Sequence, residues 1–188
     1  MALSASIFKI ALQVSDLDRQ YYGSYSLTVA RHPSETDERM MVRLLAFMQY
    51  ADERLVFSKG LSETDEPDLW IRSFSGHPEL WIEVGMPTVK RIVSGGRKAD
   101  KIAVFAYGRS AEQWWKKNRD DLEKVRNLEL VVLPVSLTEA LAKRAERSMQ
   151  WQCLVQDRQM NLINDGETFE LDLENCVRLP LSGRNPLF

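Results

Sequence analysis

The chain has 188 residues, of which 44% are hydrophobic and 28% are charged, and its formal net charge is −2 with a pI near 5.8. This composition is typical of a globular protein, and it excludes a disordered chain or a membrane protein because no apolar run approaches the length of a membrane span. The chain has no overall basic excess of the kind that indicates nucleic-acid binding. We expect one domain, residues 1–188, without a signal peptide and with a cytoplasmic location.

The cysteines and histidines do not form a metal-binding pattern. Cys153 and Cys176 stand in no CxxC or other ligand spacing, and His32 and His77 are distant from each other and from both cysteines. A structural zinc site therefore has no ligand set, and we expect both cysteines to be small buried residues.

The N-terminal part of the chain predicts a hairpin and then a long helix. Residues 6–16 and 20–31 alternate in the manner of strands on either side of a polar turn, which favours an antiparallel hairpin. Residues 33–53 repeat apolar side chains at helical spacing. Ser34 followed by Asp37 resembles a capping box, so the helix is expected to begin there.

The middle of the chain predicts three strands, a short helix and a fourth strand. The strands are expected at 55–59, 68–74, 79–85 and 101–108, and the helix at 87–96, ending at Gly95-Gly96. Because a strand–helix–strand connection is a right-handed crossover, residues 79–85 and 101–107 should be parallel neighbours.

The C-terminal part predicts two more helices and a group of strands. The helices are expected at 110–125 and at 137–148 with Ser136 as the cap, a buried strand at 128–135, and short strands in 149–176 with turns at Asp157-Arg158 and Asn164-Asp165-Gly166. The fold class is therefore α/β, with an α+β mixed sheet.

Three acidic residues suggest where chemistry takes place. Glu38 lies in the first turn of the long helix, on the apolar side that should face the sheet. Asp68 begins a strand, and Glu83 stands between Ile82 and Val84 in the middle of the next one. A carboxylate inside an apolar strand is costly to bury unless it is paired, protonated or bound to a metal, so Glu83 is the most informative residue.

The order helix–strand–strand–strand–helix–strand, with Pro67-Asp68 and an acid on the next strand, resembles the PD-(D/E)XK nuclease superfamily. The run ELWIEVGMPTVKRI at 79–92 is similar, more narrowly, to the YaeQ family of small bacterial proteins. The resemblance covers essentially the whole chain, and its other stretches are 34-SETDERMMVRLLAFMQYA-51, 67-PDLW-70 and 100-DKIAVFAYG-108. It implies a restriction-endonuclease-like αβββαβ core, here with an N-terminal β-hairpin and additional C-terminal strands.

The resemblance also implies a site. It assigns catalytic roles to Glu38, Asp68 and Glu83 around Mg²⁺, with Asp68 and Glu83 as metal ligands, in an enzyme that cleaves phosphodiester bonds of nucleic acid. Hard oxygen ligands suit Mg²⁺, which would activate a water and offset charge on the phosphate.

The sequence departs from the superfamily pattern at one position. The motif lysine should stand two residues after Glu83, where this chain has Gly85. A basic residue of the next helix is the expected replacement, with Lys90 favoured as a catalytic residue and Arg91 second, as a binding residue. Tyr107 should lie at the same edge of the sheet as Gly85 and line the site.

Other interpretations of these residues remain open. Glu38 fits a partner for the helix dipole, Asp68 a residue that starts a strand, and Glu83 an ion pair with Arg72, Lys90 or Arg91. The protein is then either a Mg²⁺-dependent nuclease, or a non-catalytic descendant that binds nucleic acid or a protein, or one that keeps its acids as structural pairs. Core packing is the preferred role of four tryptophans that resemble base-stacking platforms, namely Trp70, Trp81, Trp114 and Trp115.

Overall fold

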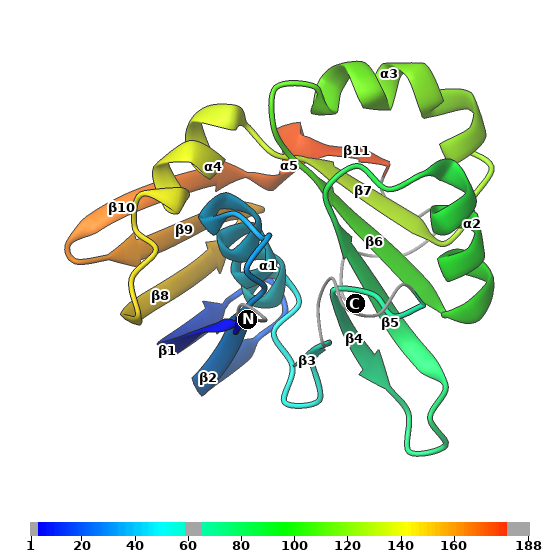
Figure 1. The fold of residues 1–188 in the computed structure, drawn as a ribbon. Helices are drawn as coiled ribbons and strands as arrows, with labels where there is room; N and C mark the ends of the chain where they lie inside the picture. Colours follow the sequence, from blue (N-terminus) through cyan, green and yellow to red (C-terminus); the bar gives the residue numbers. More distant parts are fainter. Residues whose placement is uncertain (1–3, 59–64, 180–188) are drawn as a thin grey trace.

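The structure, a computed structural model, describes residues 4–58 and 65–179 and consists of two β-sheets with a helix between them (Figure 1). The mixed α/β class is confirmed, but the strands divide between two mixed sheets instead of forming one. Among the described residues, no helix is both long enough and apolar enough to cross a membrane.

The five-stranded sheet contains strands from the N-terminal and the C-terminal part of the chain. Its order is β10-β9-β8-β1-β2, made of β10 (Glu167–Asp172), β9 (Gln159–Asn164), β8 (Ser148–Gln156), β1 (Ser6–Asp16) and β2 (Tyr21–Arg31). The predicted hairpin is confirmed, because β1 and β2 pair antiparallel along their whole length. The predicted C-terminal strands join this hairpin through a parallel pairing of β8 with β1.

The six-stranded sheet comes from the middle of the chain, except for its edge strand β11. Its order is β11-β7-β6-β5-β4-β3, made of β11 (Val177–Leu179), β7 (Leu128–Val132), β6 (Lys101–Ala106), β5 (Pro78–Val84), β4 (Leu69–Arg72) and β3 (Val56–Phe57). Strands β5 and β6 are parallel, as predicted, with Leu80 opposite Lys101 and Val84 opposite Phe105.

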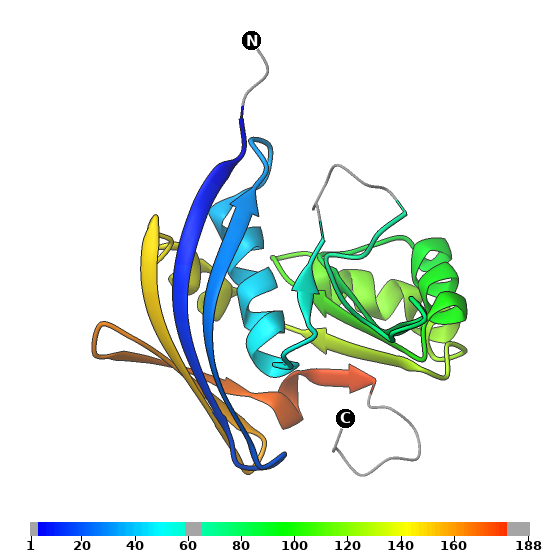
Figure 2. The ribbon, with the colours of Figure 1, turned by 90° about the horizontal axis from the view of Figure 1, so that it is seen from below.

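Helix α1 (Asp37–Gln49) packs between the sheets, and every residue from Met40 to Met48 is buried (Figure 2). The predicted cap at Ser34 is wrong. Thr36 caps the helix, since its hydroxyl accepts a hydrogen bond from the Arg39 N–H at 3.1 Å. The Ser34 hydroxyl instead pairs with the ring of His32, at 2.7 Å from Nδ1, which takes it away from the helix.

Helices α2 (Val89–Lys98) and α3 (Ala111–Leu122) cover the other face of the six-stranded sheet (Figure 1). The prediction that the first of them ends at Gly95-Gly96 is wrong, because α2 runs through both glycines to Lys98. A Cβ on Gly95 would lie 2.8 Å from Ile102 Cδ1 and 3.2 Å from Trp81 Nε1. Glycine here allows the helix to approach the sheet closely.

Helix α4 (Val135–Ala142) begins at Val135 with Pro134 in the capping position, so the predicted cap at Ser136 and the extension to 148 are wrong. The short helix α5 (Leu173–Cys176) and β11 were not predicted. They carry the chain from β10 of the five-stranded sheet to the edge of the six-stranded sheet, where β11 pairs with β7 (Figure 2).

Candidate functional site

Asp68 directly precedes β4, and Glu83 lies near the end of β5. Because these neighbouring strands are antiparallel, both acids lie at the same end of the strand pair, which we call the acid edge of the six-stranded sheet. Asp68 donates its backbone N–H to the Ile82 carbonyl at 2.8 Å, and its Oδ2 accepts the Val84 N–H at 2.7 Å. Glu83 stands between these two partners, so strand pairing fixes both acids at one place. Both are buried, with exposed fractions of 5% for Asp68 and 4% for Glu83.

The Asp68 carboxylate is neutralised from helix α1. Arg39 donates from Nη2 to Asp68 Oδ1 at 2.6 Å and from Nη1 to Glu35 Oε1 at 3.0 Å. Arg39 lies in the first turn of α1, and the Thr36 cap fixes the start of that helix. The site therefore includes a cation that interpretation of the sequence missed.

The Glu83 carboxylate is neutralised from helix α2. Its Oε1 accepts the indole N–H of Trp81 at 2.7 Å and lies 2.9 Å from Arg91 Nε. Burial raises the pKa of Glu83, the Arg91 and Trp81 hydrogen bonds lower it, and the charge of Asp68 adds to the rise. The direction of the shift is upward, since desolvation outweighs the hydrogen bonds. The ion pair considered for Glu83 is thus formed, and its partner is Arg91.

Neither Lys90 nor position 85 places a lysine beside Glu83. Lys90 is exposed on α2 and makes no ion pair with any residue that the structure describes. Gly85 has φ +109°, a left-handed conformation that a lysine adopts only with strain. The basic group beside Glu83 therefore comes from Arg91.

Glu38 and Tyr107 lie around the first turn of α1. Glu38 accepts a hydrogen bond from the Thr138 hydroxyl at 2.7 Å, so its side chain turns toward α4. Tyr107 lies at the predicted edge, with its ring Cε1 4.0 Å from where a Cβ on Gly85 would be. Burial raises the pKa of Tyr107, while the charge of Arg39 opposes the shift.

Glu35 and Arg43 are the buried charges that interpretation of the sequence missed. Arg43 donates to both carboxylate oxygens of Glu35, at 2.8 Å from Nε and 2.7 Å from Nη2, and each side chain is 1% exposed. Arg39 joins Glu35 to Asp68, which makes one buried network of two acids and two arginines. The four-residue spacing of 35, 39 and 43 was the signal that could have indicated it.

Comparison with known proteins gives the family. Residues 1–173 match the family described as "YaeQ protein". The chain belongs to the YaeQ family. "Uncharacterized protein YaeQ" of Escherichia coli (strain K12) and that of Salmonella typhi are each 42% identical to it over 174 residues, which cover 92% of this chain and 96% of each relative.

Solved YaeQ structures have the same fold. The YaeQ protein from Xanthomonas axonopodis pv. citri superposes with a TM-score of 0.89 at 43% identity, covering 93% of this chain and 98% of that one. The YaeQ protein from Pseudomonas syringae gives 0.84 at 36% identity, covering 88% of this chain and 92% of that one. These likenesses extend over both sheets, since they cover nearly the whole chain.

The tryptophans of this YaeQ-family chain near the acids belong to the core. Trp81 and Trp115 are buried, and Trp70 packs edge to face on Trp81 with ring centroids 6.2 Å apart. Trp81 also holds Glu83 through its indole N–H, so its polar atom is already used. The preferred packing role is confirmed for these residues.

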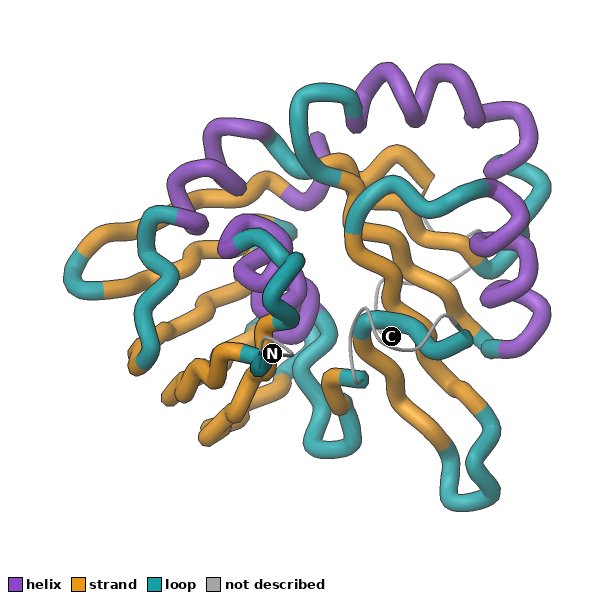
Figure 3. The backbone as a smooth tube through the Cα atoms, in the orientation of Figure 1, coloured by secondary structure: helices purple, strands orange, loops and turns teal. Residues whose placement is uncertain are grey.

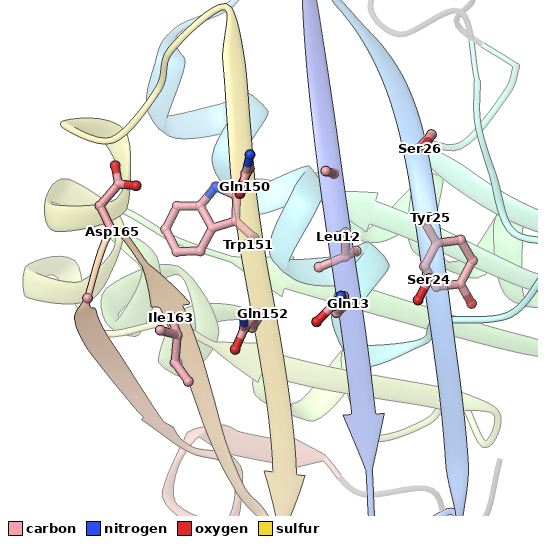
Figure 4. Close-up of a pocket in the computed structure, with 12 residues that line it drawn as sticks. Leu12, Gln13, Ser24, Tyr25, Ser26, Gln150, Trp151, Gln152, Ile163 and Asp165 are labelled. Atoms are coloured by element: carbon pink, nitrogen blue, oxygen red, sulfur yellow. The ribbon is translucent and has the colours of Figure 1, made fainter.

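A hollow of about 490 Å³ lies elsewhere, against the five-stranded sheet (Figure 4). Its lining includes neutral side chains of β8, β1 and β2, among them Gln150, Gln152, Gln13, Ser24 and Ser26, together with Asp165 of a turn. None of the candidate site residues lines it. The hollow and the acid pair are therefore features of different sheets.

Proposed function

We propose that this protein is a Mg²⁺-dependent phosphodiesterase that cleaves nucleic acid at the edge formed by Asp68 and Glu83. One observation carries the proposal: two buried carboxylates stand at neighbouring positions where β4 begins and β5 ends, one residue beyond the Leu69–Ile82 pair, with an arginine beside each. The element order α1-β3-β4-β5-α2-β6 supports it, because it is the order that resembles the core of the PD-(D/E)XK nucleases.

The residues present fit Mg²⁺ held by two carboxylates. Among the described residues, no group of three or more acidic, histidine or cysteine side chains gathers as a metal site. Mg²⁺ does not need such a cage, since it commonly binds through one or two carboxylates and keeps several waters. Glu83 uses only Oε1 for Trp81 and Arg91, which leaves Oε2 for a metal next to Asp68. When bound, the ion would polarise the phosphate and lower the pKa of a coordinated water.

Arg91 and Tyr107 would position the substrate. An arginine guanidinium serves as a fixed cation and not as a general base. The Nε of Arg91 lies 2.9 Å from Glu83 Oε1 and its Nη2 donates to the Glu66 carbonyl at 2.7 Å, so both contacts hold its positive charge beside the acids, where it would attract a phosphate. Because the pKa of Tyr107 is raised, its hydroxyl stays protonated and is a hydrogen-bond donor at the same edge. Lys90, exposed one residue before Arg91, would contact the substrate backbone.

A second candidate is a non-catalytic member of the fold that binds nucleic acid or a protein. The observation in its favour is that Arg39 and Arg91 already neutralise Asp68 and Glu83. A buried acid that is fully paired needs no metal. In this case binding to nucleic acid would weaken steeply with salt, whereas binding to a protein would not.

The test is cleavage of single- and double-stranded DNA and RNA with Mg²⁺ or Mn²⁺. We expect metal-dependent cleavage by the wild type and none by Glu83→Gln. Glu79→Gln is the matched control, because Glu79 is an acid of the same strand that pairs with Arg54 at 2.8 Å instead of facing Asp68. No cleavage of any substrate, or equal cleavage by Glu83→Gln, would overturn the proposal.

A second pair of variants identifies the basic group. Arg91→Met should lose most of the activity, because it removes the cation that pairs with Glu83. Lys90→Met changes the neighbouring exposed residue and should reduce activity less. If Lys90→Met lost more activity than Arg91→Met, the basic group of the proposed site would be Lys90.

A further inference from the structure

The outer edge of strand β2 carries no other described strand. β2 is the last strand of the five-stranded sheet, and among the described strands it pairs with β1 alone. Helix α1 lies beside β2 in Figure 2, and its Phe47 packs on Tyr25, but Figures 1 and 3 show no second strand along this edge. An edge strand presents a row of unpaired N–H and C=O groups, which form a template for another strand.

The backbone of β2 is free for such pairing over most of its length. Between Tyr21 and Val29, its N–H and C=O groups bond to no described residue outside β1. The carbonyl of Ala30 is the exception, because it accepts a hydrogen bond from Arg43 Nη2 at 2.9 Å. In an antiparallel ladder alternate residues point away from the partner, so the strand offers about five outward-facing positions.

The side chains of β2 do not protect the edge. Residues 21–30, YYGSYSLTVA, contain no charge and no proline, and the pairing with β1 shows no register shift that would twist the edge away. Proteins commonly protect an exposed edge with lysine, proline or a bulge. Tyrosine, threonine and valine also favour extended strands.

The other three edges differ from β2. β10 is six residues long and carries Glu167, Glu170 and Asp172, so like charges would meet if it paired with a copy of itself. β3 has two residues and β11 has three. Among the described residues, β2 is the one long edge strand that carries no charge over ten consecutive positions, since Arg31 is its last residue.

We propose that the protein forms a twofold dimer in which β2 pairs antiparallel with β2 of a second copy, joining the two five-stranded sheets into one. The strand is complementary to itself: an axis through Tyr25 places Ser24 opposite Ser26 and Tyr22 opposite Thr28 of the partner. Both of these outer-face pairs are neutral and hydrogen-bonding, and no charged residues meet between positions 21 and 29. A second copy is the occupant that this neutral, symmetric sequence fits.

The test is the mass in solution by sedimentation velocity over a range of concentrations. We expect a wild-type dimer that dissociates on dilution, and a monomer for Ser24→Lys/Ser26→Lys, since the axis brings these lysines opposite each other. The matched control is Gln152→Lys on β8, which adds a lysine to the same outer face in the middle of the sheet and should leave the dimer intact.

Three results would overturn the proposal: a wild-type monomer at every concentration, a dimer that the double lysine variant leaves unchanged, or a dimer that Gln152→Lys also dissociates, which would indicate pairing through the face. Hydrogen exchange of the wild type gives an answer even if a variant fails to fold. Amides of β2 should gain protection as concentration rises, while those of β10 should not. Equal behaviour of the two strands would count against the β2 interface.

Discussion

The two sheets of this protein differ in how they hold charge. The interior of the five-stranded sheet is apolar, and its buried polar residues, Asp16 and Asn164, lie at strand ends. The six-stranded sheet and the start of α1 hold four buried charges, Glu35, Arg43, Asp68 and Glu83.

Burying charge costs stability that an apolar residue of the same size would not, so its concentration in one half indicates where a function has been built. The five-stranded sheet, in contrast, holds a mainly apolar core and carries the edge strand for which we propose the dimer contact. Four variants test this difference between the two sheets.

Arg43→Met should have the largest effect on stability. It leaves Glu35 buried without its bidentate partner, which costs about 3–5 kcal/mol in the free energy of unfolding. Urea denaturation measures this, and adding Glu35→Gln to the variant should recover part of the loss. A loss below about 1 kcal/mol would mean that the pair contributes no more than a surface ion pair.

Leu12→Ala should destabilise the protein without touching the site. Leu12 is 1% exposed in the core of the five-stranded sheet, and its truncation costs about 2–5 kcal/mol. Metal binding by the folded variant should equal that of the wild type. If metal affinity fell together with stability, the two sheets would not be separable in function.

Gly85→Lys places a lysine where the proposed nuclease motif would have one, and it should not raise activity. The left-handed backbone at this position costs a lysine about 1–3 kcal/mol, so we expect lower stability and no gain in cleavage. Met86→Lys is the control, because it adds the same charge at the next, exposed position and leaves Gly85 unchanged. A Gly85→Lys variant of unchanged stability and higher activity would show that the motif position is available.

Thr36→Ala should have the smallest effect of the four. It removes the cap of α1 and costs about 1 kcal/mol. Ser34→Ala should cost less, because Ser34 bonds to His32 and not to the helix. Thermal melts of the two variants compare them directly, and a larger loss for Ser34→Ala would contradict the observed cap.

Local patterns were enough to predict much of the fold. The β1–β2 hairpin and the parallel β5–β6 pair follow from alternation and from crossover handedness. The division into two sheets did not follow, because it depends on the pairing of β1 with β8, strands that lie far apart in sequence. The predicted helix at 87–96 ended too early, because Gly95 and Gly96 allow close packing against the sheet and do not end α2. No local sequence pattern distinguishes these two roles of glycine.

The sequence predicted both acids of the candidate site and one of its two cations. Asp68 and Glu83 stand out because an acid in an apolar strand is costly. Arg91 was expected as a binding residue and as one possible ion-pair partner of Glu83, whereas Arg39 does not stand out, since arginines on a helix usually face solvent. Only the three-dimensional arrangement shows that Arg39 reaches Asp68 from α1 and that Arg91, and not Lys90, pairs with Glu83 from α2.

Calorimetric titration of Mn²⁺ into the wild type and Glu83→Gln tests the central claim most directly. If Asp68 and Glu83 form a metal site, the wild type should bind Mn²⁺ and Glu83→Gln should lose that binding, while Glu79→Gln keeps it. A wild type that binds no Mn²⁺, or a Glu83→Gln variant that binds it equally well, would contradict the claim and leave the acids as structural partners of Arg39 and Arg91.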